Sequence, residues 1–175
     1  MKYVIVIDMQ NDFISKALGS EKAQIAAKNA EIQLNSYKDE NTRVIYTLDT
    51  HYTDYLNTLE GKNLPVEHCI RDTDGWQIHP ELEPLRKDEP IDKPSFGSVA
   101  LAQLLKTYDT YEEKIEEITL IGLCTDICVI SNAMIIKAYL PETPITVDSQ
   151  CCAGVTPESH KRALETMAVC QIKII

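Results

Sequence analysis

Short, nearly all-apolar runs rich in β-branched residues alternate along the chain with segments of helical periodicity. Five runs are typical of strands covered on both faces: YVIVID (3–8), RVIYTLD (43–49), ITLIGL (118–123), PITVDS (144–149) and CQIKII (170–175). Helices are predicted over 20–38, 98–109, 125–140 and 157–168. We therefore expect a three-layer α-β-α fold, in which a central, mostly parallel sheet of about six strands carries helices on both faces.

The stretch between residues 50 and 95 interrupts this alternation. It holds five prolines and two glycines, which favour irregular structure over a helix. A long excursion of this kind in a compact domain is usually functional. No repeat, low-complexity tract or linker divides the sequence, so residues 1–175 are expected to form a single domain.

Composition and charge exclude several classes of function. The formal net charge is −10, whereas a nucleic-acid groove needs a basic face. No apolar run approaches the roughly 20 residues of a membrane span. Asp8 interrupts the first apolar run, and no small-residue cleavage site follows, so 3–8 is interpreted as a strand and not a signal peptide. We expect a cytoplasmic protein that acts on a small molecule, with no nucleic-acid or membrane partner.

The six cysteines are expected to be reduced in a cytosolic chain of this size, where they serve as core thiols, metal ligands or a nucleophile. Four of them, Cys69, Cys151, Cys152 and Cys170, are interpreted as small buried hydrophobic side chains. Two cysteines, Cys124 and Cys128, remain as candidates for chemistry.

Chemically active side chains follow the predicted strands. Asp8 ends the first strand, Asp49 and His51 end the second, and the segment 124–128 leads from strand 118–123 into a helix. Ligands of open α/β sheets bind at the carboxyl ends of the strands. The sequence therefore predicts an active site at this edge of the sheet.

Cys128 is expected in the first turn of a helix, where backbone N–H groups and the helix dipole favour a thiolate and can stabilise an oxyanion. Cys124, at the strand–helix junction, is expected to pack its side chain and to offer its backbone N–H. Asp8 is a candidate base, and Lys93 is a candidate cation that lowers the pKa of a thiol. These residues alone leave open that both cysteines are core thiols, that Asp8 caps a turn and that Lys93 is solvated. Asp126 is interpreted as a structural helix-start acid.

Five motifs occur in order along the chain: VIDMQNDF (6–13), DTH (49–51), PVEHC (65–69), KPSFGS (93–98) and GLCTDICV (122–129). Their order and spacing resemble the isochorismatase-like cysteine hydrolases, most closely the nicotinamidases (pyrazinamidases), over essentially the whole chain. The resemblance implies a catalytic triad of Asp8, Lys93 and Cys128. It also implies a cis peptide bond between Leu123 and Cys124, an oxyanion hole made by the N–H groups of Cys124 and Cys128, and a switch in strand order near the first and fourth strands.

A second set of residues is typical of a metal site. Asp49 and His51 lie two apart at a strand end, so their side chains point the same way. Together with Glu60 and His68 they form an N/O set that suits Zn²⁺, or Mn²⁺ or Fe²⁺ with added waters. The resemblance implies that these four bind a divalent metal, with zinc as the expected ion. Asp54 is the alternative to Glu60 as the ligand at a position where the family often has a histidine.

The resemblance also implies that Phe13 forms an aromatic wall of the substrate pocket. Many nicotinamidases carry a tryptophan three residues before the last metal-binding histidine, where this chain has Pro65. Trp76 is a candidate replacement. His79 and His160 match no ligand position of the family and are interpreted as surface or packing residues.

The expected reaction is hydrolysis of nicotinamide to nicotinate and ammonia through a cysteine thioester, a step of pyridine nucleotide salvage. One alternative is hydrolysis of another small amide, of a carbamoyl or ureido compound, or of isochorismate. Another is a zinc-binding or interaction protein on a scaffold that has lost its catalytic activity. Members of the family often form dimers or tetramers, so the resemblance also allows a homo-oligomer.

Overall fold

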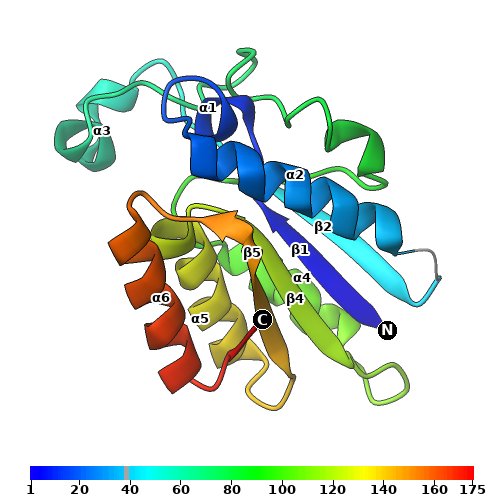
Figure 1. Ribbon diagram of the computed structural model, residues 1–175. Coiled ribbons are helices and arrows are strands. Elements are labelled where there is room, and N and C mark those ends of the chain that lie inside the picture. Colours follow the sequence, from blue (N-terminus) through cyan, green and yellow to red (C-terminus); the bar gives the residue numbers. More distant parts are fainter. Residues whose placement is uncertain (38–39) are drawn as a thin grey trace.

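The computed structural model describes residues 1–37 and 40–175 of the chain. Its centre is a six-stranded sheet with the order β3-β2-β1-β4-β5-β6, in which all described pairings are parallel (Figure 1). The strands are β1 (Lys2–Ile7), β2 (Thr42–Asp49), β3 (Ile91–Lys93), β4 (Glu117–Leu123), β5 (Ile145–Ala153) and β6 (Lys173–Ile174). The expected central parallel sheet is confirmed.

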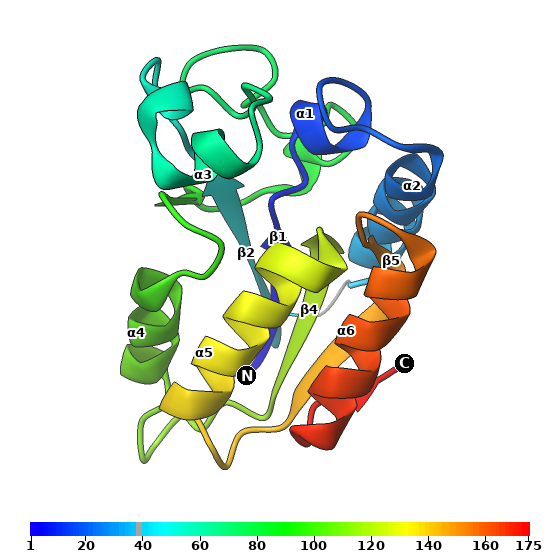
Figure 2. The same cartoon turned by 90° about the vertical axis from the view of Figure 1, so that its left-hand side faces the viewer.

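Helices cover both faces of this sheet. The longer ones are α2 (Glu21–Ser36), α4 (Val99–Tyr108), α5 (Ile130–Tyr139) and α6 (Pro157–Val169), and the short ones are α1 (Asn11–Ile14) and α3 (Leu59–Asn63). Helix α2 lies on one face, and α4, α5 and α6 lie on the other (Figures 1 and 2). Each face has its own cluster of buried apolar side chains, so the predicted three-layer architecture is confirmed.

Local capping explains where two of the predicted helices begin. The Ser20 hydroxyl accepts a hydrogen bond from the Ala23 N–H at the start of α2. At the start of α6, Thr156 and Ser159 form a reciprocal capping box. Helix α2 is described to Ser36, and Lys38, the last residue of the predicted helix 20–38, lies outside the described residues.

Two predictions of local structure need correction. The excursion 50–95 contains 3₁₀ turns at Tyr55–Asn57 and Glu83–Leu85, the helix α3 and, at its end, the edge strand β3. Prolines on both sides of this three-residue strand conceal it in the sequence. The last strand is shorter than the predicted 170–175, because α6 continues to Val169 and Gln171 has a left-handed φ of 67°.

The direction of strand order changes at β1, since β2 and β3 lie on one side of it and β4, β5 and β6 on the other. The carboxyl ends of β1 and β4 therefore border the crevice where ligands of such sheets bind. Gly122 allows the two strands to approach here, because it has a φ of 133° and a Cβ on it would lie 2.1 Å from the Ile7 carbonyl oxygen. Within the described ranges, no helix combines the length and apolar character needed to cross a bilayer.

Candidate active site and metal centre

Asp8, Lys93 and Cys128 meet at the crevice between β1 and β4. Asp8 directly follows β1, and Lys93 ends β3 in register with Asp49 of β2. The Lys93 Nζ lies 2.7 Å from Asp8 Oδ2, 3.1 Å from Asp49 Oδ1 and 3.4 Å from Cys128 Sγ. All four side chains are buried. The alternative in which Lys93 is solvated is therefore wrong.

Burial and neighbouring charges set the protonation of this cluster. Burial raises the pKa of Asp8, and Lys93 opposes that rise. Burial also raises the pKa of Cys128 well above its ordinary value, and the nearby carboxylate of Asp8 adds to the rise. Although burial disfavours its charge, Lys93 has a raised pKa because Asp8, Cys128 and Asp49 surround it. The resting site thus places a thiol of raised pKa beside the 2.7 Å contact between Asp8 and Lys93.

Cys128 lies in a π-helical turn, Thr125–Val129, which connects β4 to α5. The turn follows a cis peptide bond between Leu123 and Cys124. The Cys124 carbonyl accepts hydrogen bonds from the N–H groups of Ile127 and Val129, both at 3.1 Å, and so bypasses the N–H of Cys128. This turn replaces the ordinary first helical turn that the sequence predicts around Cys128.

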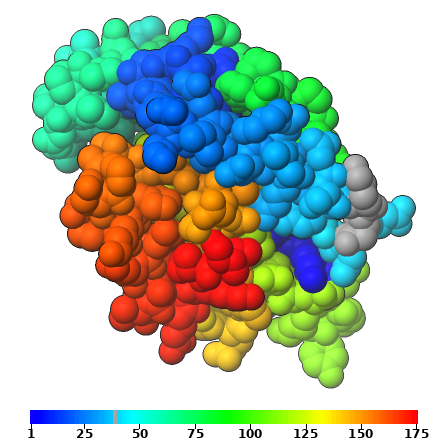
Figure 3. Space-filling model, in the orientation of Figure 1, coloured from blue at the N-terminus to red at the C-terminus, as the bar shows by residue number. Residues whose placement is uncertain are grey.

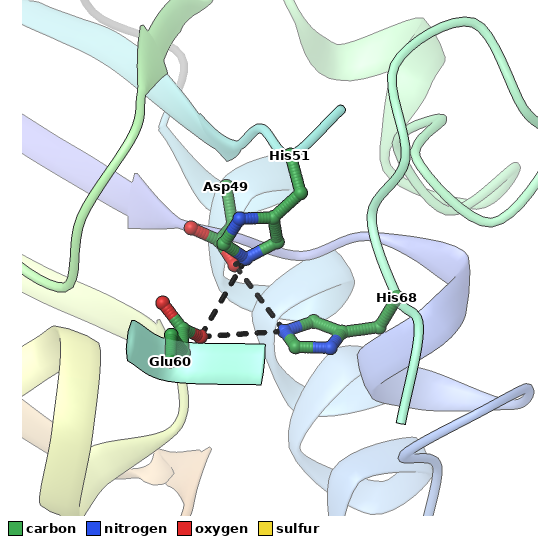
Figure 4. A group of neighbouring side chains, drawn as sticks. All are labelled: Asp49, His51, Glu60 and His68. Atoms are coloured by element: carbon green, nitrogen blue, oxygen red, sulfur yellow. Dashed lines mark ion pairs between the residues drawn. The ribbon is translucent and has the colours of Figure 1, made fainter. Parts of the chain in front are cut away.

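The four predicted metal ligands come together beside this cluster. One ligand atom from each of Asp49, His51, Glu60 and His68 lies within 4.8 Å of the other three. Asp49 and His51 project from the end of β2, Glu60 comes from α3 and His68 from the excursion, and they point toward a common centre (Figure 4). Glu60 thus joins the group, whereas Asp54 is exposed and lies outside it.

Distances and hydrogen bonding within this group fit a metal ion. Two atoms bound tetrahedrally to one zinc at about 2.1 Å lie roughly 3.4 Å apart. His51 Nε2 lies 3.1 Å from Asp49 Oδ2 and 3.5 Å from Glu60 Oε1, and His68 Nε2 lies 3.7 Å from each of these oxygens. Within the described part of the chain, the buried His51 Nε2 has no hydrogen-bond partner. His68 Nδ1 lies 2.8 Å from the Val66 carbonyl, which orients Nε2 toward the group.

A pocket of about 270 Å³ opens onto both clusters. Cys124, Cys128, Asp49, Glu60 and His68 contribute to its chemically active part. Its other walls are mostly apolar and come from Phe13, Leu18, Ser20, Ala23, Leu64, Leu123, Ile127, Ala153, Gly154 and Val155. Figure 3 shows that chain segments near residues 20 (blue), 60 (teal) and 155 (orange) adjoin on one face of the molecule.

Three buried polar residues support the site and were not singled out from the sequence. The Thr47 hydroxyl donates to Asp8 Oδ1 at 2.6 Å, and the Gln10 side chain bonds both the N–H and the C=O of Asp49. Asn132 donates to the Cys128 carbonyl. Gln10 lies within the VIDMQNDF motif, and Asn132 lies one helical turn after Cys128, so both positions carried a local signal.

Other predicted residues have structural surroundings. Trp76 donates to the Thr50 hydroxyl and is not among the described residues that line the pocket, which include Leu64, the neighbour of Pro65. Asp126 accepts hydrogen bonds from the Val155 N–H, and His160 contacts the Thr125 hydroxyl. The remaining predicted packing residues are half-buried His79 and the buried Cys69, Cys151 and Cys152. Cys170 is exposed, because it caps the end of α6, so its interpretation as a buried residue is wrong.

Known proteins resemble this chain over nearly its whole length. A curated isochorismatase family protein named PncA, from Bacillus subtilis (strain 168), is described as uncharacterized and is 28% identical over 177 residues, which cover 95% of this chain and 94% of that protein. The crystal structure of the nicotinamidase/pyrazinamidase PncA from Bacillus subtilis is 26% identical, with a TM-score of 0.82 and coverage of 99% and 98%.

A third relative shares the fold at lower identity. The pyrazinamidase of Pyrococcus horikoshii, solved in complex with zinc, is 21% identical with a TM-score of 0.81, and the match covers 99% of this chain and 98% of that one. The family model described as an isochorismatase domain matches residues 2–175. The chain therefore belongs to the isochorismatase family of hydrolases.

Proposed function

We propose that this protein is a cysteine amidase that hydrolyses nicotinamide to nicotinate and ammonia. The proposal is carried by the convergence of a buried Asp8–Lys93–Cys128 cluster and a four-residue metal group on one small pocket. A scaffold that only binds zinc or a partner would need neither the buried lysine nor the thiol beside it. Crystallised relatives named nicotinamidase or pyrazinamidase support the assignment.

In the proposed first half-reaction, Asp8 takes the proton of the Cys128 thiol as sulfur attacks the amide carbonyl carbon. The carbonyl π electrons move to oxygen, and the N–H groups of Cys124 and Cys128 stabilise the resulting oxyanion. The oxyanion then collapses, the C–N bond breaks, and Asp8 returns its proton to the leaving ammonia. The product at this stage is a thioester on Cys128.

In the second half-reaction, Asp8 accepts a proton from water while the water oxygen attacks the thioester carbonyl. Collapse breaks the C–S bond, and Asp8 returns its proton to the sulfur, which restores the Cys128 thiol. The acid product loses its proton to solvent and leaves as the carboxylate. The raised pKa of Asp8 makes it a stronger base than an exposed aspartate. Lys93 holds Asp8 in place through the 2.7 Å ion pair and balances its charge throughout.

Asp49, His51, Glu60 and His68 would hold the divalent metal. When bound, the metal supplies a Lewis-acid site that can bind the pyridine nitrogen and orient the ring. Two histidines and two carboxylates favour zinc, with manganese and iron as alternatives that accept the same donors. The zinc complex of the Pyrococcus horikoshii relative supports this choice.

The pocket favours a small, uncharged substrate. Among its described lining residues there is no lysine or arginine, while Asp49 and Glu60 are acidic. A substrate carboxylate, as in isochorismate, would find no lysine or arginine partner among these lining side chains. Among the described residues that line the pocket, Phe13 is the one phenylalanine, tyrosine or tryptophan, and Leu64 is aliphatic. Another small neutral amide is therefore the second candidate substrate.

Ammonia release from nicotinamide tests the proposal, measured with the metal-depleted protein and after addition of Zn²⁺ or Mn²⁺. Cys128→Ala is the control for the nucleophile. We expect metal-dependent release that the control abolishes. If the wild type binds metal and its Cys128 reacts with iodoacetamide, yet no ammonia appears, the nicotinamide assignment is wrong and other neutral amides should be assayed. An unreactive Cys128 would instead favour a scaffold without catalytic activity.

A further inference from the structure

The turn that carries Cys128 is held from its far side by α6. Thr125, the first residue of the turn, is fully buried, and its Oγ1 lies 2.8 Å from Nδ1 of His160. His160 belongs to the first turn of α6 and is half-buried. Burial lowers the pKa of His160, so the imidazole is neutral at pH 7 and can form this hydrogen bond with the Thr125 hydroxyl.

Two further contacts join the same turn to the connection between β5 and α6. The Asp126 carboxylate accepts the Val155 N–H at 3.1 and 3.2 Å. Gly154 lies so close to His160 that a Cβ on the glycine would be 2.8 Å from the His160 Cβ. Gly154 and Val155 also line the pocket. The imidazole, the connection and the turn are therefore packed together beside the pocket.

The internal hydrogen bonds of the turn do not orient it on the sheet. The Cys124 carbonyl accepts from residues three and five positions later, a pattern that combines 3₁₀ and π spacing. A single π-helical turn is a rare conformation and commonly marks a functional site. Its orientation thus depends on side-chain contacts to neighbouring elements, of which the partly buried Thr125–His160 contact is the one nearest Cys124 in sequence.

We propose that His160, acting through Thr125, is a positioning residue for the oxyanion hole. The proposal rests on the proposed function. Thr125 lies between Cys124 and Cys128, the two residues whose N–H groups would bind the oxyanion. Fixing the Thr125 side chain fixes the direction of the peptide units on both sides of it, while His160 itself contacts neither the thiol nor the pocket described above.

This role predicts a specific kinetic effect, because the oxyanion exists in the transition state and not in the bound substrate. His160→Leu and Thr125→Val should each lower kcat for nicotinamide roughly 10- to 100-fold and leave KM within about twofold. That loss is smaller than the 10²–10³-fold cost of deleting an oxyanion donor outright, since the N–H groups are displaced and not removed. The double variant should be no slower than the worse single variant.

Conservative variants separate hydrogen bonding from packing. His160→Asn places an amide atom near the position of Nδ1 and should restore most of the activity, whereas His160→Gln places its amide near Nε2 and should not. The rate of Cys128 alkylation by iodoacetamide should stay at the wild-type value in all of these variants, because the nucleophile and Asp8 are untouched. Met167→Ala is the matched control, since it removes a fully buried side chain from α6 away from the turn.

Met167→Ala should lower the thermal midpoint of unfolding and leave kcat unchanged. His160→Leu should lower kcat by more than any loss of folded protein, judged from its own thermal midpoint, can explain. Hydrolysis of p-nitrophenyl acetate, measured in parallel, also passes through an oxyanion on Cys128. If nicotinamide is not a substrate, the proposed function fails while the ester rates still decide the role of His160. Equal losses in His160→Asn and His160→Leu, or a change in KM with kcat intact, would overturn the proposal.

Discussion

At Asp8, burial and charge act in opposite directions on one carboxyl group. Its Oδ1 accepts from Thr47 and its Oδ2 pairs with Lys93, while burial raises its pKa. The motif around Asp8 predicted its identity as a base. Its degree of burial depends on neighbours 39 and 85 residues away along the chain, which no local pattern specifies.

Asp8→Asn should separate the reactivity of the resting thiol from catalysis. The Asp8 charge raises the pKa of Cys128, so its removal leaves Lys93 to stabilise the thiolate and increases the thiolate fraction at pH 7. Iodoacetamide should then alkylate Cys128 faster than in the wild type, while kcat falls at least roughly 100-fold because the base is lost. Slower alkylation would show that Asp8 already holds the thiol proton in the resting enzyme.

Glu60 and Asp54 provide a matched pair of substitutions at the metal group. Glu60→Gln should weaken zinc binding by at least roughly tenfold, because it removes one anionic ligand, whereas Asp54→Asn should bind zinc like the wild type. Competition against a chromophoric chelator measures both affinities. Equal affinities in the two variants would remove Glu60 from the metal site.

At the scale of elements, short pieces of structure carry the proposed catalytic residues. Lys93 projects from the three-residue strand β3, and Cys128 from a five-residue π-helical turn. Propensity and periodicity need longer windows than these, so the sequence predicted an irregular excursion at the first site and an ordinary helix at the second. β3 is stabilised by its pairing with β2, and the turn is stabilised by its packing on α6. Local sequence preference contains neither contact.

Asn132 of α5 connects the π-helical turn Thr125–Val129 to the loop after β3. Its Oδ1 accepts from the Ser98 N–H, and its Nδ2 donates to the carbonyls of Phe96 and Cys128. Asn132→Ala should reduce the free energy of unfolding by about 1–3 kcal/mol, because buried backbone groups lose their partners. Urea denaturation measures the change. Ser131→Ala, on the same helix and partly exposed, should cost less than half as much.

At the scale of the molecule, the metal group joins parts of the chain that the sheet does not hold together. Asp49 ends β2 and His51 follows it by two residues, whereas Glu60 and His68 come from later in the excursion and line the pocket. An ion bound by these four residues would therefore stabilise the folded excursion directly.

Metal removal should accordingly destabilise the whole protein. At a free zinc concentration 100 times Kd, binding contributes about 2.7 kcal/mol, or a rise of roughly 5–10 °C in Tm for a chain of this size. Calorimetry of the wild type with zinc and after chelation should show this difference, and Glu60→Gln should show less of it. An unchanged midpoint on chelation would mean that the excursion folds without the ion.

Alternating apolar runs and capping residues were enough to predict the parallel sheet and its longer helices, since these signals lie within short windows of the chain. The candidate site residues were named by the resemblance that the five motifs carry. The burial of Lys93, the inclusion of Glu60 in place of Asp54, the absence of Trp76 from the pocket and the anchoring of Thr125 by His160 could not be obtained that way. Each depends on contacts between segments distant in sequence, and only the packed sheet and helices bring those segments together.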